Sequence, residues 1–222
     1  MKTSKAILLV ALLFTLSGIY ANTQTIAIQA FKSLEISGYL NVTLVQSTTN
    51  KLSIKASKNL QKSIKITETN GNLCITQDHK AYRRIAITIT FTSLSEIDSK
   101  IDGKLFTAGI IKVQDLSLNI ANNGKTKLNL AANSLEADFR GKENIYLSGA
   151  AKKVNFNTKV IGLLDASTFI IDTLNVNNSG KGDVRVFVTD YVSANHIGDG
   201  TLSIDGRPDI DYCPLSISYR KE

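Results

Sequence analysis

Histidine is the first residue type to consider for chemistry, and the chain has two, His79 and His196. Asp78 precedes the first, and Asp199 follows the second by three positions. A zinc site needs three or four converging ligands at recognisable spacings, and neither histidine has such neighbours in the sequence. We therefore expect two surface histidines and predict no metal site.

Acidic residues gather near the C-terminus, where Arg207 lies among Asp199, Asp205, Asp209 and Asp211. Calcium accepts several carboxylate oxygens, but neither an EF-hand spacing nor a repeated aspartate ladder occurs here. The pattern favours a polar end cap, because repeat proteins need a polar terminal surface that stops further stacking.

General acid and base catalysis would require carboxylates that converge on one cleft. The candidates, at different offsets within their segments, are Asp138, Asp165, Asp183 and Asp199. The sequence has no Gly-x-Ser-x-Gly elbow, phosphate loop or dinucleotide fingerprint, and it has no tryptophan to stack on sugars. We predict no catalytic residue and no cofactor. A carbohydrate-active enzyme, a polysaccharide lyase or hydrolase, stays an alternative hypothesis.

The two cysteines, Cys74 and Cys213, leave the question of a disulfide open. Export would permit a bridge, but disulfide geometry is narrow and two cysteines do not make a framework.

Positive charge is concentrated early in the chain. Residues 22–92 hold nine basic and three acidic residues, a net charge of +6, whereas residues 93–222 hold fifteen basic and sixteen acidic residues, a net charge of −1. Such charge could attract an anionic envelope glycan, or it could be a solvated surface whose lysines keep strand edges from pairing. The candidate basic binding surface consists of Lys58, Lys62, Arg83 and Arg84.

Residues 1–21 are typical of a secretory signal peptide. Lys2 and Lys5 precede an apolar run over residues 6–16, and small residues lead to a cleavage site after Ala21. The run is too short to span a bilayer, and no second one follows. We expect an exported protein, in the periplasm, on the outer surface or outside the cell, without a membrane span.

Alternation of apolar and polar residues with period two dominates the rest of the chain, and only residues 57–62 could form a turn of helix. Asn70-Gly71 is a strong hairpin turn, because both residues tolerate positive φ. Seven short strands are predicted before residue 93, at 26–30, 34–37, 40–46, 52–56, 64–68, 73–77 and 85–91.

From Leu94 onward an apolar pattern recurs every 18 to 22 residues. Segments open at Leu94, Leu116, Leu135, Val154, Leu174 and Val192, and a glycine follows each opening by six to nine residues. This self-similarity is the signature of a solenoid, in which stacked segments align their apolar residues into one core. We expect glycine and asparagine to form corners with positive φ.

The sequence thus predicts an all-β protein with three parts. Residues 1–21 are the signal peptide, and residues 22–92 form a strand-rich N-terminal region that packs on the solenoid or continues it. Residues 93–222 form a glycine-punctuated β-solenoid (β-helix) of about six coils with a C-terminal cap.

Several runs of the chain also match a known pattern. They are residues 31–46, 71–75, 87–94 and 202–208, together with the glycine-bearing corners between them. In these runs the chain resembles the bacterial family described as putative auto-transporter adhesin, head GIN domain, although Ala121-Asn122-Asn123-Gly124 and Phe139-Arg140-Gly141 stand where that family has Ser-Gly-Ser-Gly corners. The resemblance implies a right-handed parallel β-solenoid and, through the family's name, adhesion.

Our leading hypothesis is a non-enzymatic envelope or surface protein that binds a glycan or another macromolecule in the manner of an adhesin, through the flat side of the solenoid. The expected partner is an unknown macromolecule or an anionic glycan at the cell envelope, and not nucleic acid. Besides the enzyme, the other alternative is a structural module that associates with copies of itself through a coil end or strand edge.

Overall fold

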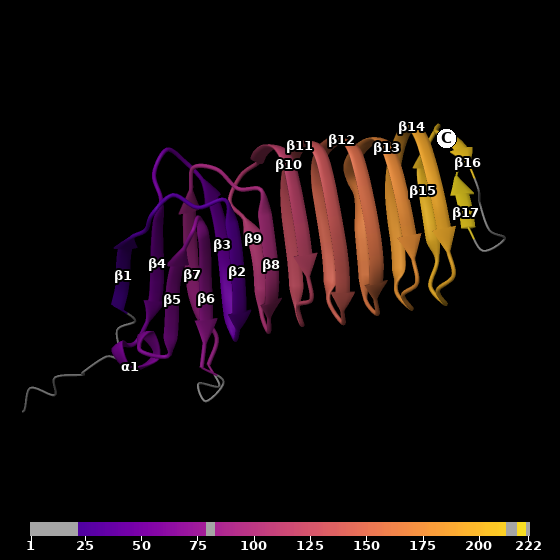
Figure 1. The fold of residues 1–222 in the computed structure, drawn as a ribbon. Coiled ribbons are helices and arrows are strands. Elements are labelled where there is room, and N and C mark those ends of the chain that lie inside the picture. Colours follow the sequence, from indigo (N-terminus) through magenta and orange to yellow (C-terminus); the bar gives the residue numbers. More distant parts are fainter. Residues whose placement is uncertain (1–21, 79–82, 212–216, 221–222) are drawn as a thin grey trace, which may run out of the picture.

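The computed structural model describes residues 22–78, 83–211 and 217–220. These residues form an all-β solenoid of about six turns, with the N-terminal region at one end and the C-terminal strands at the other (Figure 1). The predicted all-β fold and the predicted number of coils are therefore confirmed.

The described residues contain seventeen strands and one helix. The first part holds β1 (Asn22–Ala27), β2 (Ser33–Gly38), β3 (Leu40–Gln46), β4 (Lys51–Ala56), α1 (Lys58–Gln61), β5 (Ile64–Thr69), β6 (Asn72–Gln77) and β7 (Ile85–Phe91). The second part holds β8 (Glu96–Ile101), β9 (Lys104–Thr107), β10 (Ile111–Ile120), β11 (Lys125–Gly141), β12 (Asn144–Val160), β13 (Leu163–Asn178), β14 (Asp183–His196), β15 (Leu202–Gly206), β16 (Asp209–Asp211) and β17 (Ile217–Arg220). The first strand lies at residues 22–27, so its prediction at 26–30 is wrong.

Parallel pairing of successive coils aligns the repeated apolar residues. Leu116 pairs with Leu135, which aligns with Val154, Leu174 and Val192 in the following coils. The predicted openings are therefore neighbours in the structure, with one exception. Ser117 pairs with Glu96, so Leu116 aligns with Ser95 and not with Leu94.

The first coils do not stack in the order of the chain. β2 pairs in parallel with both β6 and β8, and β3 pairs in parallel with both β7 and β9. The chain therefore places β2 and β3 between two later pairs of strands. Beyond them, antiparallel partners complete the sheet: β4 pairs with β7 and β1, and β5 pairs with β6 through the predicted turn, where Asn70 and Gly71 have φ of 50° and 76°.

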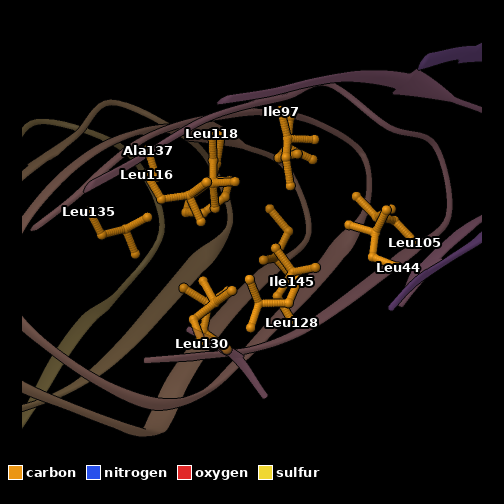
Figure 2. Packing of buried hydrophobic residues seen from close by; sticks show 14 of the residues in the cluster. Leu44, Ile97, Leu105, Leu116, Leu118, Leu128, Leu130, Leu135, Ala137 and Ile145 are labelled. Carbon is orange, nitrogen blue, oxygen red and sulfur yellow. The ribbon is translucent and has the colours of Figure 1, made fainter. Parts of the chain in front are cut away.

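The core consists of inward columns of aliphatic and aromatic side chains. In Figure 2, Leu118 of β10 lies on one side of the coil interior. Leu128 from the first half of β11 and Ile145 of β12 lie on the opposite side. Side-chain volumes alternate where bulky rings enter: Phe156 aligns with Ala137, and its ring lies 5.6 Å from that of Phe139. Each fully buried large aliphatic side chain contributes about 1.5–3 kcal/mol, so stacking coils is the main source of stability.

Glycine is needed at the corners because adjacent coils touch there. Gly103, Gly124, Gly162, Gly182 and Gly200 lie in one column of corners. A Cβ atom on Gly182 would lie 1.8 Å from the carbonyl oxygen of Gly162, and one on Gly124 would lie 2.0 Å from that of Gly103. Their φ values are not in the left-handed region, so the expectation of positive φ is wrong for this column. The constraint is contact with the backbone of the preceding coil.

Glu143 stands in this corner column, where the neighbouring coils have Gly124 and Gly162. Its side chain is fully buried, and Thr126 Oγ1 donates a hydrogen bond to its Oε2 at 2.7 Å. Asn122 Nδ2 in turn donates to Thr126 Oγ1 at 3.1 Å, and Asn122 Oδ1 accepts from Ser99 Oγ at 2.8 Å. Burial raises the pKa of Glu143 to about 7, although the bonds from Thr126 and Asn122 act in the opposite direction.

Substitution of the corner glycines tests the contact between coils. We expect Gly182→Ala to lower the free energy of unfolding by about 3 kcal/mol, because the added methyl group overpacks against a backbone that cannot move away. Urea unfolding followed by circular dichroism gives the value. Gly71→Ala is the matched control, since that position has free space and loses only about 1 kcal/mol through its positive φ. Equal losses in the two variants would contradict the explanation.

Glu143 should make the fold less stable as pH rises. Its carboxyl binds a proton more tightly in the folded state than in the unfolded chain. The protonated carboxyl therefore contributes fully to the free energy of unfolding below pH 4.5, and this contribution is lost as pH rises through about 7. The loss is on the order of 3 kcal/mol. Glu143→Gln should remove this dependence and exceed the native protein in stability at pH 8, as measured by urea unfolding at pH 5 and pH 8. The exposed Glu136→Gln serves as control, and a native pH slope in Glu143→Gln would refute the assignment.

Candidate binding surfaces

Two outward columns of polar side chains run across β8 and the second halves of β10 to β14. They alternate with buried core residues along each strand, so they face solvent together. We call them the amide–carboxylate face. Its first column is Glu96, Ser117, Glu136, Asn155, Asn175 and Ser193, and its second is Asp98, Asn119, Asp138, Asn157, Asn177 and Asn195.

The amide–carboxylate face changes character along the solenoid. Its carboxylates come from β8 and β11, whereas β12 and β13 contribute asparagines alone. Neighbouring side chains hold one another: Asn119 Nδ2 donates to Asp98 Oδ2 at 3.0 Å, and Asn195 Nδ2 donates to Asn177 Oδ1 at 3.2 Å. Rows of amide groups at the strand spacing of about 4.8 Å present both donors and acceptors, as needed to bind hydroxyl or peptide groups.

Sequence reasoning missed this face, although a signal was present. The motif Asn-x-Asn occurs at residues 155–157 and again at 175–177, one coil apart. Asn119 and Asn195 belong to the same column as Asn157 and Asn177, with Asp138 between Asn119 and Asn157. Polar outward residues thus repeat at the coil period, as the apolar residues do.

A second outward surface combines lysine and aromatic side chains. Across β9 and the first halves of β11 to β14, one column contains Phe106, Lys127, Tyr146, Asp165 and Arg185. Lys125 lies beside it, with its Nζ 4.5 Å from the centroid of the Tyr146 ring. We call this surface the lysine–aromatic face, and a pocket of about 200 Å³ opens at Tyr146 and Asp165.

The predicted basic residues lie at one end of the N-terminal region. Lys58 and Lys62 are exposed in and just after α1, which follows β4, and Arg83 and Arg84 are exposed just before β7. Because β4 and β7 pair antiparallel, the end of β4 lies beside the start of β7, so the two pairs of residues share this edge.

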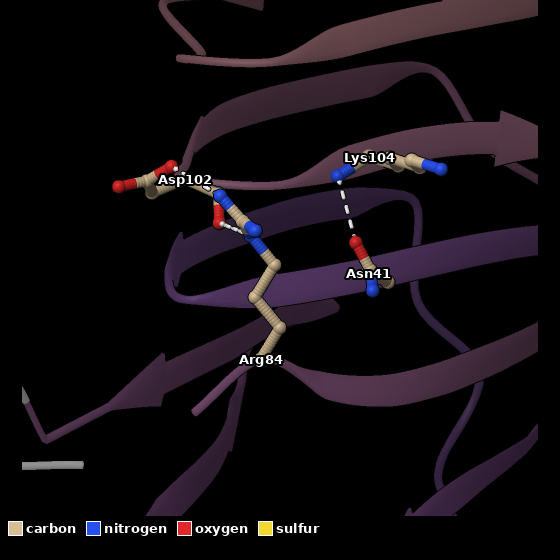
Figure 3. A network of polar contacts seen from close by, with 4 residues as sticks. All are labelled: Asn41, Arg84, Asp102 and Lys104. Atoms are coloured by element: carbon tan, nitrogen blue, oxygen red, sulfur yellow. Dashed lines mark hydrogen bonds and ion pairs between the residues drawn. The ribbon is translucent and has the colours of Figure 1, made fainter. Parts of the chain in front are cut away.

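The side chain of Arg84, one of these four residues, contacts Asp102. Its Nη2 lies 3.3 Å from Asp102 Oδ1, and its Nε donates to the Asp102 carbonyl oxygen at 3.1 Å (Figure 3). In the same view Lys104 N donates to Asn41 Oδ1 at 3.1 Å. Arg84 thus helps to tie β7 to the turn between β8 and β9.

The four aspartates considered as a general acid or base lie at different register positions in the solenoid. Asp138 is on the amide–carboxylate face and pairs with Arg140, whereas Asp165 is on the lysine–aromatic face. Asp183 Oδ1 accepts from Thr201 N at 3.0 Å and Thr201 Oγ1 at 2.7 Å, and these bonds lower its pKa. Asp199 is exposed in a corner. Each of the four occupies a different column, and Asp165 and Asp183 lie on adjacent strands, two register positions apart.

His196 is buried, so the prediction of a surface histidine there is wrong. Asn178 Nδ2 donates to His196 Nδ1 at 2.9 Å, and His196 Nε2 lies 2.9 Å from the Gly200 carbonyl oxygen. This pairing requires a neutral ring protonated on Nε2. Asn178 Oδ1 also accepts from Gly180 N at 3.1 Å, so His196 belongs to a corner hydrogen-bond network.

Other residues singled out in the sequence have simpler outcomes. Cys74 lies half-buried on β6, where burial and the adjacent Glu35 raise the pKa of its thiol. His79 and Cys213 lie outside the described residues. In the part of the chain that the structure describes, no three His, Cys, Asp or Glu side chains are placed to hold a metal ion, and no helix is long and apolar enough to cross a membrane.

Solved structures with the same fold come from Bacteroides fragilis and Parabacteroides distasonis. A "putative adhesin" from Bacteroides fragilis NCTC 9343 is 20% identical, with a TM-score of 0.80 over 90% of this chain and 93% of that one. A "putative lipid binding protein" from Parabacteroides distasonis ATCC 8503 is 19% identical, with a TM-score of 0.67 over 91% and 97%. At these identities the likeness establishes the fold alone.

The family comparison covers most of the chain. No match is found among curated proteins. Residues 30–208, from the loop before β2 to the residue before β16, match one family over nearly the whole described solenoid. The resemblance inferred from the sequence is therefore confirmed, and the chain belongs to the family described as "Putative auto-transporter adhesin, head GIN domain".

Proposed function

We propose that this protein is an exported, non-enzymatic binding protein of the cell envelope or surface, which holds a glycan or another macromolecule along the amide–carboxylate face. The observation that carries the proposal is the pair of aligned polar columns, with Asn155, Asn157, Asn175 and Asn177 all exposed side by side. An extended ligand laid along the solenoid would meet asparagine amides on β12 and β13 and carboxylates on β8 and β11.

The geometry supports binding because the face is already ordered. Hydrogen bonds between Asn119 and Asp98 and between Asn195 and Asn177 fix their amides before a ligand arrives, which reduces the conformational entropy lost on binding. The description of the family as an adhesin head domain agrees with this role.

Binding is also favoured over catalysis by the placement of carboxylates. Asp138 is paired with Arg140, and Asp183 is bound by Thr201, so both are used in local contacts. A glycoside-cleaving enzyme needs two free carboxyl groups across one scissile bond, and Asp165, like Asp183, already accepts local hydrogen bonds, from Ser167.

Loss of the exposed amides should weaken the proposed binding. An array of neutral and acidic glycans and purified envelope polymers first identifies a ligand. In the double variant Asn157→Ala/Asn177→Ala, we expect the affinity for that ligand to fall about tenfold, because the ligand groups that bind these amides lose their hydrogen bonds. Biolayer interferometry on the selected ligand gives the ratio.

The matched control for this test is Asn133→Ala, which removes an exposed asparagine from β11 outside the face. Its affinity should equal that of the native protein. An array on which nothing binds, or equal weakening by the control, would remove the support for the amide–carboxylate face.

The basic surface remains a second candidate for anionic ligands, because Lys58 and Lys62 extend from α1 without acidic residues in its first turn. Lys58→Glu/Lys62→Glu should reduce the affinity for polygalacturonate about tenfold at low ionic strength. The difference in affinity should be smaller in about 0.5 M salt, because salt screens the charges. Lys153→Glu/Lys159→Glu makes the same change of charge on exposed residues of β12. If both variants lose binding equally, net charge alone explains it.

A further inference from the structure

One coil of the solenoid breaks the regular register and opens a pocket. Tyr146 of β12 pairs with Asp165 of β13, but Ser148 pairs with Thr168, so β13 carries one extra residue there. On the other side of β13 the register shifts again between Ala166 and Ile170. Such β-bulges redirect side chains locally and are frequent next to functional sites.

Contacts within the bulge hold it in a defined shape. Asp165 Oδ1 accepts hydrogen bonds from Ser167 N at 3.1 Å and from Ser167 Oγ at 2.6 Å. Thr168 Oγ1 donates to the Leu147 carbonyl oxygen at 3.2 Å. The pocket beside the bulge measures about 200 Å³ and is lined by Lys127, Tyr146, Leu147, Ser148, Asp165, Ser167 and Thr168.

The size of the pocket limits its ligand. Pockets for drug-sized molecules measure about 300–1,000 Å³, so this one suits a smaller group, such as one sugar ring. Tyr146 supplies an aromatic wall, and the apolar CH groups of a sugar pack on such a surface.

The hydrogen-bonding character of the lining points to a ligand rich in donors. The hydroxyl hydrogens of Ser167 and Thr168 are already given to Asp165 and to the backbone, which leaves their oxygens as acceptors. The Asp165 carboxylate adds further acceptor capacity. Hydroxyl groups of a sugar would supply the matching donors, and Lys127 could donate to a ring or hydroxyl oxygen.

Charge argues for a neutral ligand. The lining carries one basic and one acidic side chain, Lys127 and Asp165, whose charges balance, so a carboxylate or an amine in the pocket would meet a like charge as well as an opposite one. We propose that the bulge of β13 forms a binding site for one neutral sugar ring, a site separate from the amide–carboxylate face.

The test is a titration of the ¹⁵N-labelled protein with methyl glycosides of neutral hexoses and deoxyhexoses, followed by NMR chemical shifts. We expect saturable shifts at the backbone amides of Tyr146, Ser148, Asp165, Ser167 and Thr168 for at least one neutral sugar, with about millimolar affinity for a single ring. Glucuronate and glucosamine should bind more weakly. Absence of shifts with every neutral sugar, or binding of the charged sugars alone, overturns the proposal.

Variants locate the binding and separate it from the proposed function. Asp165→Asn replaces one acceptor by a donor and should weaken binding about tenfold, and Tyr146→Ala should weaken it similarly by removing the aromatic wall. Asp172→Asn, on the same strand outside the pocket, and Asn157→Ala/Asn177→Ala should bind the sugar as the native protein does. If the Asn157/Asn177 variant loses the sugar and Asp165→Asn keeps it, the sugar binds on the other face.

Discussion

The structure depends on the backbone ladder that holds parallel coils about 4.8 Å apart. At the glycine corners this distance leaves no room for a side chain between one coil and the next: the carbonyl oxygen of Gly162 lies where a side chain on Gly182 would begin. Along the strands the same spacing brings residues of equal register into contact, so that Leu116, Leu135 and Val154 form one column. Corner glycines and apolar columns are therefore two consequences of a single constraint.

Residues that point outward escape this constraint, and it is there that the chemistry of the surface can vary. Most inward positions of β12 and β13 carry apolar side chains that pack in the core, whereas their outward positions carry asparagine on one face and Tyr146 or Asp165 on another. Because the register aligns each outward position from coil to coil, side chains of one kind at that position form a row, as Asn155 and Asn175 do. The amide–carboxylate face and the lysine–aromatic face are therefore extended surfaces of different chemistry on one rigid scaffold.

Much of the fold could be predicted from the sequence because inward columns repeat their apolar type. The openings from Leu116 to Val192 were placed in register, and the Asn70-Gly71 turn was located. The position of β2 between β6 and β8 could not be predicted from the sequence. Its pairing partners lie 39 and 63 residues away, and these separations do not repeat along the chain. The burial of His196 could not be predicted because its partner Asn178, 18 residues earlier, becomes a neighbour only through the register.

Two local features of the structure depart from the repeat and could not be predicted from its period: the buried Glu143 and the bulge in β13. Glu143 in the glycine column requires a local network with Thr126 and Asn122, because a buried carboxyl needs hydrogen-bond partners. The bulge in β13 likewise needs Asp165 to hold Ser167. A perfectly regular solenoid offers the same surface at every coil and cannot distinguish one point along its length. An insertion in a single coil creates that distinction, and this is why the pocket that we propose for one sugar ring lies at β13, where the register shifts. The amide–carboxylate face, where the register is continuous, suits a long ligand.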